Sequence, residues 1–277
     1  MIRQLGPATL FCSFSAAETK WNHLLKILGK LVDKKDYIDE ELDNLMWEEK
    51  TRLIQRDPVT CARHFDYQFQ LFFSKVLSSN LLPLGKIEDW FYRVEFQQRG
   101  SPHIHMLLWI KGAPQFGVHS DHDVVSFIDQ IITCSKEPND PSLSALLVRQ
   151  SHSHSQTCKK KKKIACRFKF PQPPMRETSI LYPLQENVVA SEKSKLKGEF
   201  RKLYEKLNDM KDGENVTFDD LLVKLGVSEE EYILAIRSSL VGPTVFLKRN
   251  PNELRINNYN KVCLLAWRAN IDRKSVV

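Results

Sequence analysis

Two histidines separated by one residue, His103 and His105, open an apolar run that ends at Ile110. In a β-strand successive side chains alternate between the two faces, so both imidazoles would lie on one face of a sheet. Two imidazoles side by side on a stiff strand are pre-positioned ligands for a divalent metal ion. A bare His-x-His pattern is more often an ordinary pair of strand residues. Here Glu95, eight positions earlier and across a turn predicted at 99–102, could complete a set of two histidines and one carboxylate, which leaves coordination positions open for a substrate oxygen.

A second group of metal-binding residue types lies further along the chain. It contains two histidines and two cysteines within fifteen residues: His152, His154, Cys158 and Cys166. Structural zinc sites prefer four tetrahedral nitrogen or sulfur ligands, and a polar segment with little core of its own can draw its folding energy from the metal. The residues alone leave two interpretations open, which are a structural zinc site and a basic loop whose cysteines bind nothing.

The positive charge of the chain is concentrated in one segment. The sequence has 41 Lys and Arg against 34 Asp and Glu, a formal net charge of +7. Residues 158–170 hold seven of the basic residues and no acidic one, which leaves 34 of each sign elsewhere. A local basic patch on a balanced chain favours nucleic-acid contact. The predicted contacts are Lys159, Lys160, Lys161, Lys162, Lys163 and Arg167. A nuclear-localisation signal or a solvated loop are the other interpretations of the lysine run.

The elements that must position these groups follow from the hydrophobic pattern. Strands are predicted at 8–14 and on both sides of the turn at 99–102, and a helix is predicted to begin at Asp57-Pro58. Residues 217–240 predict two helices joined at Gly226. Three acidic residues open the second of these helices, which favours packing over DNA reading because they would face phosphates. Strands from distant segments with helices between them indicate an α+β fold.

Composition places the chain among globular proteins, with 42% hydrophobic and 27% charged residues. No stretch approaches the apolar length that spans a membrane, and the N-terminus lacks the pattern of a secretory signal. We therefore expect an intracellular protein whose six cysteines bind metal or stay as free thiols. We expect a core over 1–135, a linker and Cys/His-Lys insert over 136–185, and a mostly helical segment over 186–277.

The segment VEFQQRGSPHIHMLLW, residues 94–109, resembles the metal-binding motif of the HUH endonucleases in the version found in the helicase-like N-terminal domain of Helitron transposon proteins. The resemblance implies a small antiparallel sheet carrying the HUH strand with packed helices, similar to the ferredoxin-like arrangement. It implies rolling-circle nicking and transfer of single-stranded DNA, with Mg²⁺ or Mn²⁺ held by His103, His105 and Glu95. Gln97, on the same strand face, is the alternative third ligand. The segment through Phe170-Pro171 and Arg176-Glu177-Thr178 also resembles the Cys/His-rich insert of these domains, which favours structural Zn²⁺.

The same resemblance raises the question of the nucleophile. HUH enzymes cleave DNA with a tyrosine, and Helitron-like proteins carry a Tyr-x-x-x-Tyr pair on a helix, which puts both hydroxyls on one face. No two of the seven tyrosines here are four residues apart. Tyr259 lies in a segment that resembles the one just before the nucleophile helix. We expect a copy cut short of its nucleophile, and the rival expectation is that Tyr259 acts alone.

The family also sets the expected partners. These are single-stranded DNA and the helicase module of a full-length Helitron protein. We expect a nuclear location and no contact with a membrane. No G-x-x-x-x-G-K-[ST] loop occurs in the sequence, so nothing in these residues can cradle ATP phosphates. The alternative function is a non-catalytic, zinc-containing nucleic-acid-binding module derived from a transposon.

Overall fold

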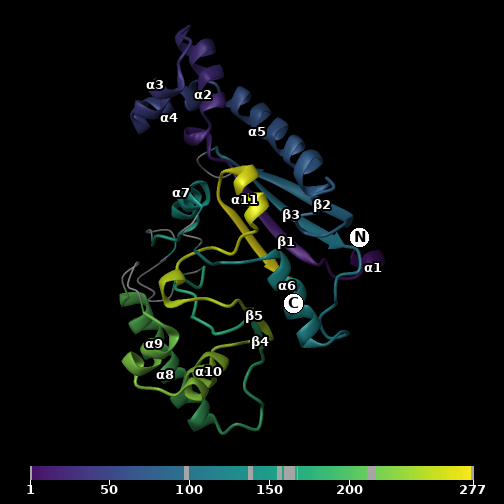
Figure 1. Ribbon diagram of the computed structural model, residues 1–277, viewed down its shortest axis with the longest axis vertical. Helices are drawn as coiled ribbons and strands as arrows, with labels where there is room; N and C mark the ends of the chain where they lie inside the picture. The colour runs from purple at the N-terminus through teal and green to yellow at the C-terminus, as the bar shows by residue number, and fades with distance from the viewer. Residues whose placement is uncertain are drawn as a thin grey trace. The chain divides into compact units, whose positions relative to one another are not determined.

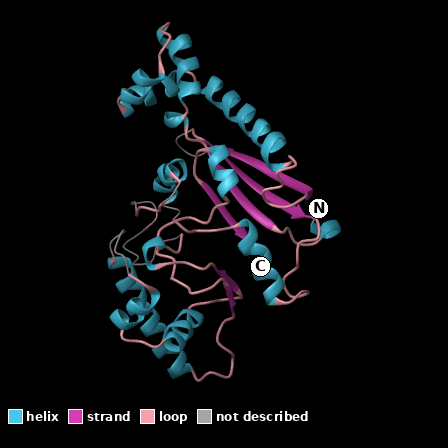
Figure 2. Cartoon of the chain, viewed as in Figure 1, coloured by secondary structure: helices cyan, strands magenta, loops and turns pink. Residues whose placement is uncertain are grey.

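The computed structural model describes residues 2–96, 100–136, 140–154, 158, 166, 168–210 and 216–275. The chain divides into two compact units, and each is described by itself. Unit 1 comprises Met1–Lys111 and Asn260–Lys274, and unit 2 comprises Gly112–Tyr259 and Ser275–Val277. Both contain helices and strands (Figure 2), which confirms the α+β class.

The centre of unit 1 is a four-stranded sheet in the order β2-β3-β1-β6. Its strands are β1 (Leu10–Ser15), β2 (Ile87–Phe96), β3 (Pro102–Ile110) and β6 (Ile271–Ser275). The strand β3 pairs antiparallel with β1 on one side and with β2 on the other. The predicted small antiparallel sheet is therefore present, and its strand β3 carries His103 and His105. A strand at β6 was not predicted.

One face of this sheet is covered by aromatic side chains from two helices. They are α5 (Pro58–Phe72), which Asp57 caps by accepting a hydrogen bond from the Thr60 amide, and α11 (Lys261–Trp267). Figure 1 shows both helices beside the sheet. The Trp267 ring lies at the centre of this layer, with ring centroids 5.3–6.4 Å from four phenylalanines: Phe14, Phe65, Phe69 and Phe72. Burying these large rings anchors the apolar face of β1 and β3.

The remaining helices of unit 1 are short. They are α1 (Ile2–Leu5), α2 (Asn22–Leu28), α3 (Asp39–Asn44) and α4 (Trp47–Arg56), with a 3₁₀ turn at Glu18–Lys20 and π-helical turns at Gly29–Asp33 and Phe73–Leu77. Each of the helices α2, α3 and α4 buries at least one leucine completely. Such short helices gain most of their stability from this tertiary packing.

Unit 2 is mainly helical. Its elements are α6 (Asp121–Ile131), α7 (Pro141–Gln150), α8 (Ala190–Asp209), α9 (Phe218–Leu225), α10 (Glu229–Ser238), a 3₁₀ turn at Pro251–Glu253 and the antiparallel pair β4 (Ser179–Leu181) and β5 (Thr244–Phe246). The predicted helix pair joined at Gly226 is confirmed, because Gly226 ends α9 with φ of 72°. Leucines of α8 and α9 share one core with Tyr232 and Ile236 of α10.

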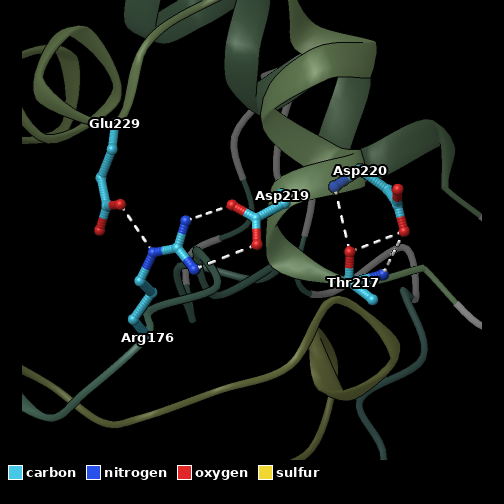
Figure 3. A network of polar contacts seen from close by, with 5 residues as sticks. All are labelled: Arg176, Thr217, Asp219, Asp220 and Glu229. Carbon is cyan, nitrogen blue, oxygen red and sulfur yellow. Dashed lines mark hydrogen bonds and ion pairs between the residues drawn. The ribbon is translucent and has the colours of Figure 1, made fainter.

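Arg176 ties the first turns of α9 and α10 together (Figure 3). Its Nε donates to the Glu229 carboxylate at 2.7 Å, and its terminal nitrogens donate to both oxygens of Asp219. Thr217 and Asp220 close a capping box at the start of α9. The acidic residues therefore serve helix N-termini and an arginine, in agreement with the packing interpretation of this segment. Among the described residues, no helix is both long and apolar enough to cross a membrane.

A buried histidine makes unit 1 sensitive to acid. His64 on α5 is 8% exposed, and its Nδ1 is buried without a hydrogen-bond partner among the described residues. Burial, with a smaller contribution from His23, lowers the pKa of His64 from 6.5 to about 4. The unfolded chain therefore binds this proton more readily, so the neutral histidine's contribution to stability is complete above pH 6.5 and is lost as the pH falls toward 4.

We expect the melting temperature of the wild-type protein to drop more steeply between pH 6.5 and pH 4.5 than that of His64→Phe. The phenylalanine cannot take up a proton, whereas the carboxylates titrate alike in both proteins. Thermal melts followed by circular dichroism at each pH give the comparison. His122→Phe, at a largely exposed site, serves as the control and should follow the wild type. Parallel pH profiles for His64→Phe and wild type would contradict the assignment.

Candidate metal centres

The register of the sheet in unit 1 brings the predicted metal ligands of β2 and β3 onto neighbouring positions. Glu95 pairs with His103, and Arg93 pairs with His105. The predicted alternative ligand, Gln97, lies outside the described residues. Antiparallel pairing across the turn therefore converts an eight-residue separation in sequence into direct cross-strand contact.

His105 is already close to a carboxylate. Its Nε2 lies 3.3 Å from Oε2 of Glu95. The Phe11 ring of β1 stacks on the imidazole, with centroids 5.4 Å apart and an interplanar angle of 23°. Nδ1 of His105 is buried and has no hydrogen-bond partner among the described residues. Two donor atoms 3.3 Å apart can both lie about 2.1 Å from one ion, so His105 and Glu95 fit a shared metal.

His103 is held by two serines of β1. Oγ of Ser13 lies 2.6 Å from Nε2, and Oγ of Ser15 lies 2.9 Å from Nδ1. Ser13 pairs with His105 in the β1–β3 register, so Nε2 is the nitrogen turned toward His105. Burial lowers the pKa of His103, and His105 lowers it further while Glu95 opposes the shift. The imidazole is therefore neutral near pH 7, as metal coordination requires.

The contacts of His103 show what metal binding on the sheet would require. The ring centroids of His103 and His105 are 4.7 Å apart. A metal ion between His103 and His105 has to replace the Ser13 hydroxyl at Nε2, while Ser15 can keep the ring oriented through Nδ1. Within the described ranges, the sheet residues do not form a group of three converging donors.

The orienting serine is itself positioned by a distant part of the chain. The Trp267 indole donates a hydrogen bond to the Ser15 carbonyl at 3.0 Å, and the Ser15 amide donates to the Asn270 carbonyl at 3.1 Å. Asn260 caps α11 and donates from its side chain to the Pro83 carbonyl at 2.9 Å. Residues 260–271 therefore brace the strand β1 next to the histidine pair.

The four residues of the predicted zinc site lie together in unit 2. One donor atom from each of His152, His154, Cys158 and Cys166 falls within 4.8 Å of all the others. Nδ1 of His154 is 3.5 Å from the Cys158 sulfur, and Nε2 of His152 is 3.3 Å from the Cys166 sulfur. Both sulfurs are buried and neither forms a disulfide. Two thiolates and two imidazoles at these distances could hold a metal ion such as zinc.

Further contacts orient the histidines of this cluster. Nε2 of His154 donates to the Asn208 side-chain oxygen at 3.0 Å, which leaves Nδ1 facing the sulfurs. The Phe170 ring stacks on His152 with centroids 4.5 Å apart and planes 11° apart. The His152 amide donates to the Arg255 carbonyl, and the Arg255 guanidinium donates to the Asn208 carbonyl at 2.7 Å. Outer contacts of this kind fix the tautomer and ring orientation of metal-bound histidines.

The predicted basic contacts lie outside the described residues. These are Lys159, Lys160, Lys161, Lys162, Lys163 and Arg167. Tyr259 is described and is fully buried, with its hydroxyl donating to the Ser135 carbonyl at 2.7 Å. Its amide and carbonyl both bond to Thr133. A nucleophile must reach its phosphate, so this placement gives Tyr259 a structural role and argues against the expectation that it acts alone.

Several residues that contact these sites were not predicted, among them Ser13, Ser15 and Asn208. Ser13 lies in the predicted strand at 8–14 and Ser15 directly follows it, and their alternation matches that of the two histidines on β3, so the sequence held a usable signal. Asn208 lies 54 residues from His154. Nothing in its sequence surroundings indicates that contact.

Comparison with known proteins adds one finding. Residues 1–108 match the family described as the Helitron helicase-like domain at N-terminus. A comparison with curated proteins found no match. The matched segment includes β1, β2 and nearly all of β3, and so it contains Glu95 and both sheet histidines. It ends before the Cys/His cluster.

For the sheet site we expect opposite effects from two small substitutions. Ser13→Ala should strengthen Mn²⁺ binding by about fivefold, because the ion no longer competes with a hydrogen bond worth about 1 kcal/mol. His103→Ala should weaken binding by at least about tenfold through loss of a ligand. Isothermal titration or the electron paramagnetic resonance of free Mn²⁺ measures both. His122→Ala is the matched control. Weaker Mn²⁺ binding by Ser13→Ala would show that Ser13 does not occupy the metal-facing nitrogen.

For the Cys/His cluster we expect purified wild-type protein to contain one zinc ion per chain, and Cys166→Ser to lose it. Without the ion, hydrogen exchange should speed up around residues 168–175, because among the described residues the cluster's core is Cys158, Cys166 and Phe170. Cys134→Ser, at another buried cysteine of unit 2, should keep the metal. Elemental analysis after dialysis gives the metal content. Wild-type protein with reduced cysteines and negligible zinc would contradict the site.

Proposed function

We propose that this chain, whose residues 1–108 match the Helitron helicase-like N-terminal domain family, is the HUH module of a rolling-circle transposon protein that binds single-stranded DNA through a divalent metal. The observation that carries the proposal is the 3.3 Å approach of Glu95 to His105 beside His103. This arrangement lies in the part of the chain that matches the family.

The donor set fits Mg²⁺ or Mn²⁺. One carboxylate and two imidazoles on a sheet leave open positions, where a bound divalent ion would polarise a scissile phosphate. The chain's own groups do the positioning: Ser15 holds the His103 ring, and Phe11 covers one face of His105. These contacts pre-organise the ligands before DNA arrives.

The strand-cleaving nucleophile is the missing part of this chemistry. In the HUH reaction a tyrosine oxygen attacks the phosphorus, the P–O3′ bond breaks, and a 5′-phosphotyrosine and a free 3′-hydroxyl result. The 277 residues contain no Tyr-x-x-x-Tyr pair, and Tyr259 is buried. We therefore propose that these residues bind the DNA and present the phosphate, and that they do not form the covalent link themselves.

The alternative proposal is a zinc-containing nucleic-acid-binding module in which the sheet histidines no longer act. The Cys/His cluster supports it, since a structural metal would order a segment whose sequence holds seven basic residues over 158–170. The two proposals locate DNA binding in different units. In both, we propose that the protein acts on nuclear DNA.

We expect the chain to bind labelled single-stranded DNA in the presence of Mn²⁺ and to form no adduct that survives denaturing electrophoresis. Binding by zinc-loaded protein should fall when Mn²⁺ is omitted and in His105→Ala, whereas Tyr259→Phe should bind as tightly as wild type if it still folds. Gel shifts and denaturing gels on the same samples provide both readouts.

Two outcomes would change this conclusion. Binding that needs no Mn²⁺, survives His105→Ala and is lost in Cys166→Ser would favour the zinc module. A covalent adduct that disappears in Tyr259→Phe would restore the single-tyrosine enzyme. The salt dependence of binding separates phosphate contacts from other interactions, because each neutralised phosphate adds about 0.7 to the slope for single strands.

A further inference from the structure

The sheet face that carries the two histidines of β3 continues onto the neighbouring strand β2. The Tyr92 ring packs on Phe69 of α5, with centroids 4.9 Å apart, so Tyr92 lies on the helix-covered face. Successive strand residues alternate between faces. Phe91 and Arg93 therefore lie on the opposite face, together with Glu95.

The register places these two residues next to the metal ligands. Arg93 pairs with His105, and Phe91 pairs with Leu107 one step further along β3. Phe11 pairs with Leu107 from the other side and stacks on His105. On this face Arg93 is therefore level with His105, and the rings of Phe91 and Phe11 are level with Leu107, the next outward position along the strands.

Both β2 side chains are open to a ligand. Phe91 is 50% exposed, so its ring is accessible from this face of the sheet. Arg93 is exposed, and its guanidinium has no hydrogen-bond or ion-pair partner within the described part of the chain. A guanidinium without an internal partner beside a metal ligand is suited to a second anionic group of the molecule that binds the metal.

We propose that Phe91 and Arg93 form a nucleotide-binding subsite for single-stranded DNA beside His103 and His105. Arg93 contacts a backbone phosphate next to the metal-bound one, and Phe91 stacks on the adjoining base. This inference rests on the proposed function, and it deepens it by naming how the strand is held.

The geometry favours a single strand over a duplex. Alternate residues of a strand are about 6.8 Å apart, so Phe91 and Arg93 present one ring and one cation in a short linear series. A ring on a flat sheet face can stack only on a base whose own face is open, which holds for single strands and not for paired DNA. Stacking is tolerant of sequence, so the subsite would position DNA without choosing its bases.

The first test compares two phenylalanines of β2. Phe91→Ala should raise the dissociation constant for single-stranded DNA in Mn²⁺ by about 5- to 150-fold, the range measured for loss of one stacked base. Phe96→Ala is the matched control, because Phe96 is 62% exposed on the same strand but on the opposite face. Phe91→Trp should keep the affinity, since a larger ring still stacks. Both sites are exposed, so folding should survive.

The second test concerns Arg93. Arg93→Gln should lower the slope of log affinity against log salt by about 0.7, the contribution of one phosphate contact to a single strand. Arg63→Gln, at an exposed arginine of α5, should leave the slope unchanged.

An abasic scan of the oligonucleotide identifies the stacked base. Wild-type protein should lose affinity at one abasic position where Phe91→Ala loses none, because the same contact cannot be removed twice. If wild type binds DNA in a Mn²⁺-dependent manner that His105→Ala abolishes, yet Phe91→Ala and Arg93→Gln match their controls, the subsite is overturned and the proposed function stands. If wild type binds no single-stranded DNA, both are overturned.

Discussion

The period-two alternation of side chains along β3 is the constraint on which the rest of unit 1 depends. Ile104, Met106 and Leu108 point into the aromatic layer under Trp267 and are almost completely buried. The intervening positions, including both histidines, are forced onto the other face. A shift of the register by one residue would exchange these faces, so the same packing that stabilises the sheet also fixes where its chemistry can occur.

The two candidate metal centres are built differently. In the Cys/His cluster four donors already converge, because one short segment supplies them and Asn208 and Arg255 orient it from outside. On the sheet, a carboxylate approaches only one histidine, and serine hydroxyls hold the other. The first arrangement suits an ion that stabilises the fold, and the second suits an ion that exchanges ligands with a substrate phosphate.

The family match covers a shorter range of residues than the folded unit 1. The match ends at residue 108, whereas the sheet is completed by β6 and covered by Trp267, more than 150 residues further along. This late segment also braces Ser15 and through it the His103 ring. Substitutions at 260–271 should therefore alter the position of the His103 ring, although none of the predicted metal ligands lies in that segment.

The sequence by itself determined the α+β class, the helix start at Asp57, the helix pair around Gly226 and both groups of candidate ligands. These follow from local rules: strand and helix periodicity, capping chemistry and the spacing of ligand types. Only the tertiary structure decided that β6 joins the sheet, that Ser13 occupies the nitrogen of His103 turned toward His105, and that Tyr259 is buried. The residues in such contacts lie about 90 positions apart or more in the sequence. The packing of the whole unit decides which of them pair, and this choice cannot be read from the local sequence pattern.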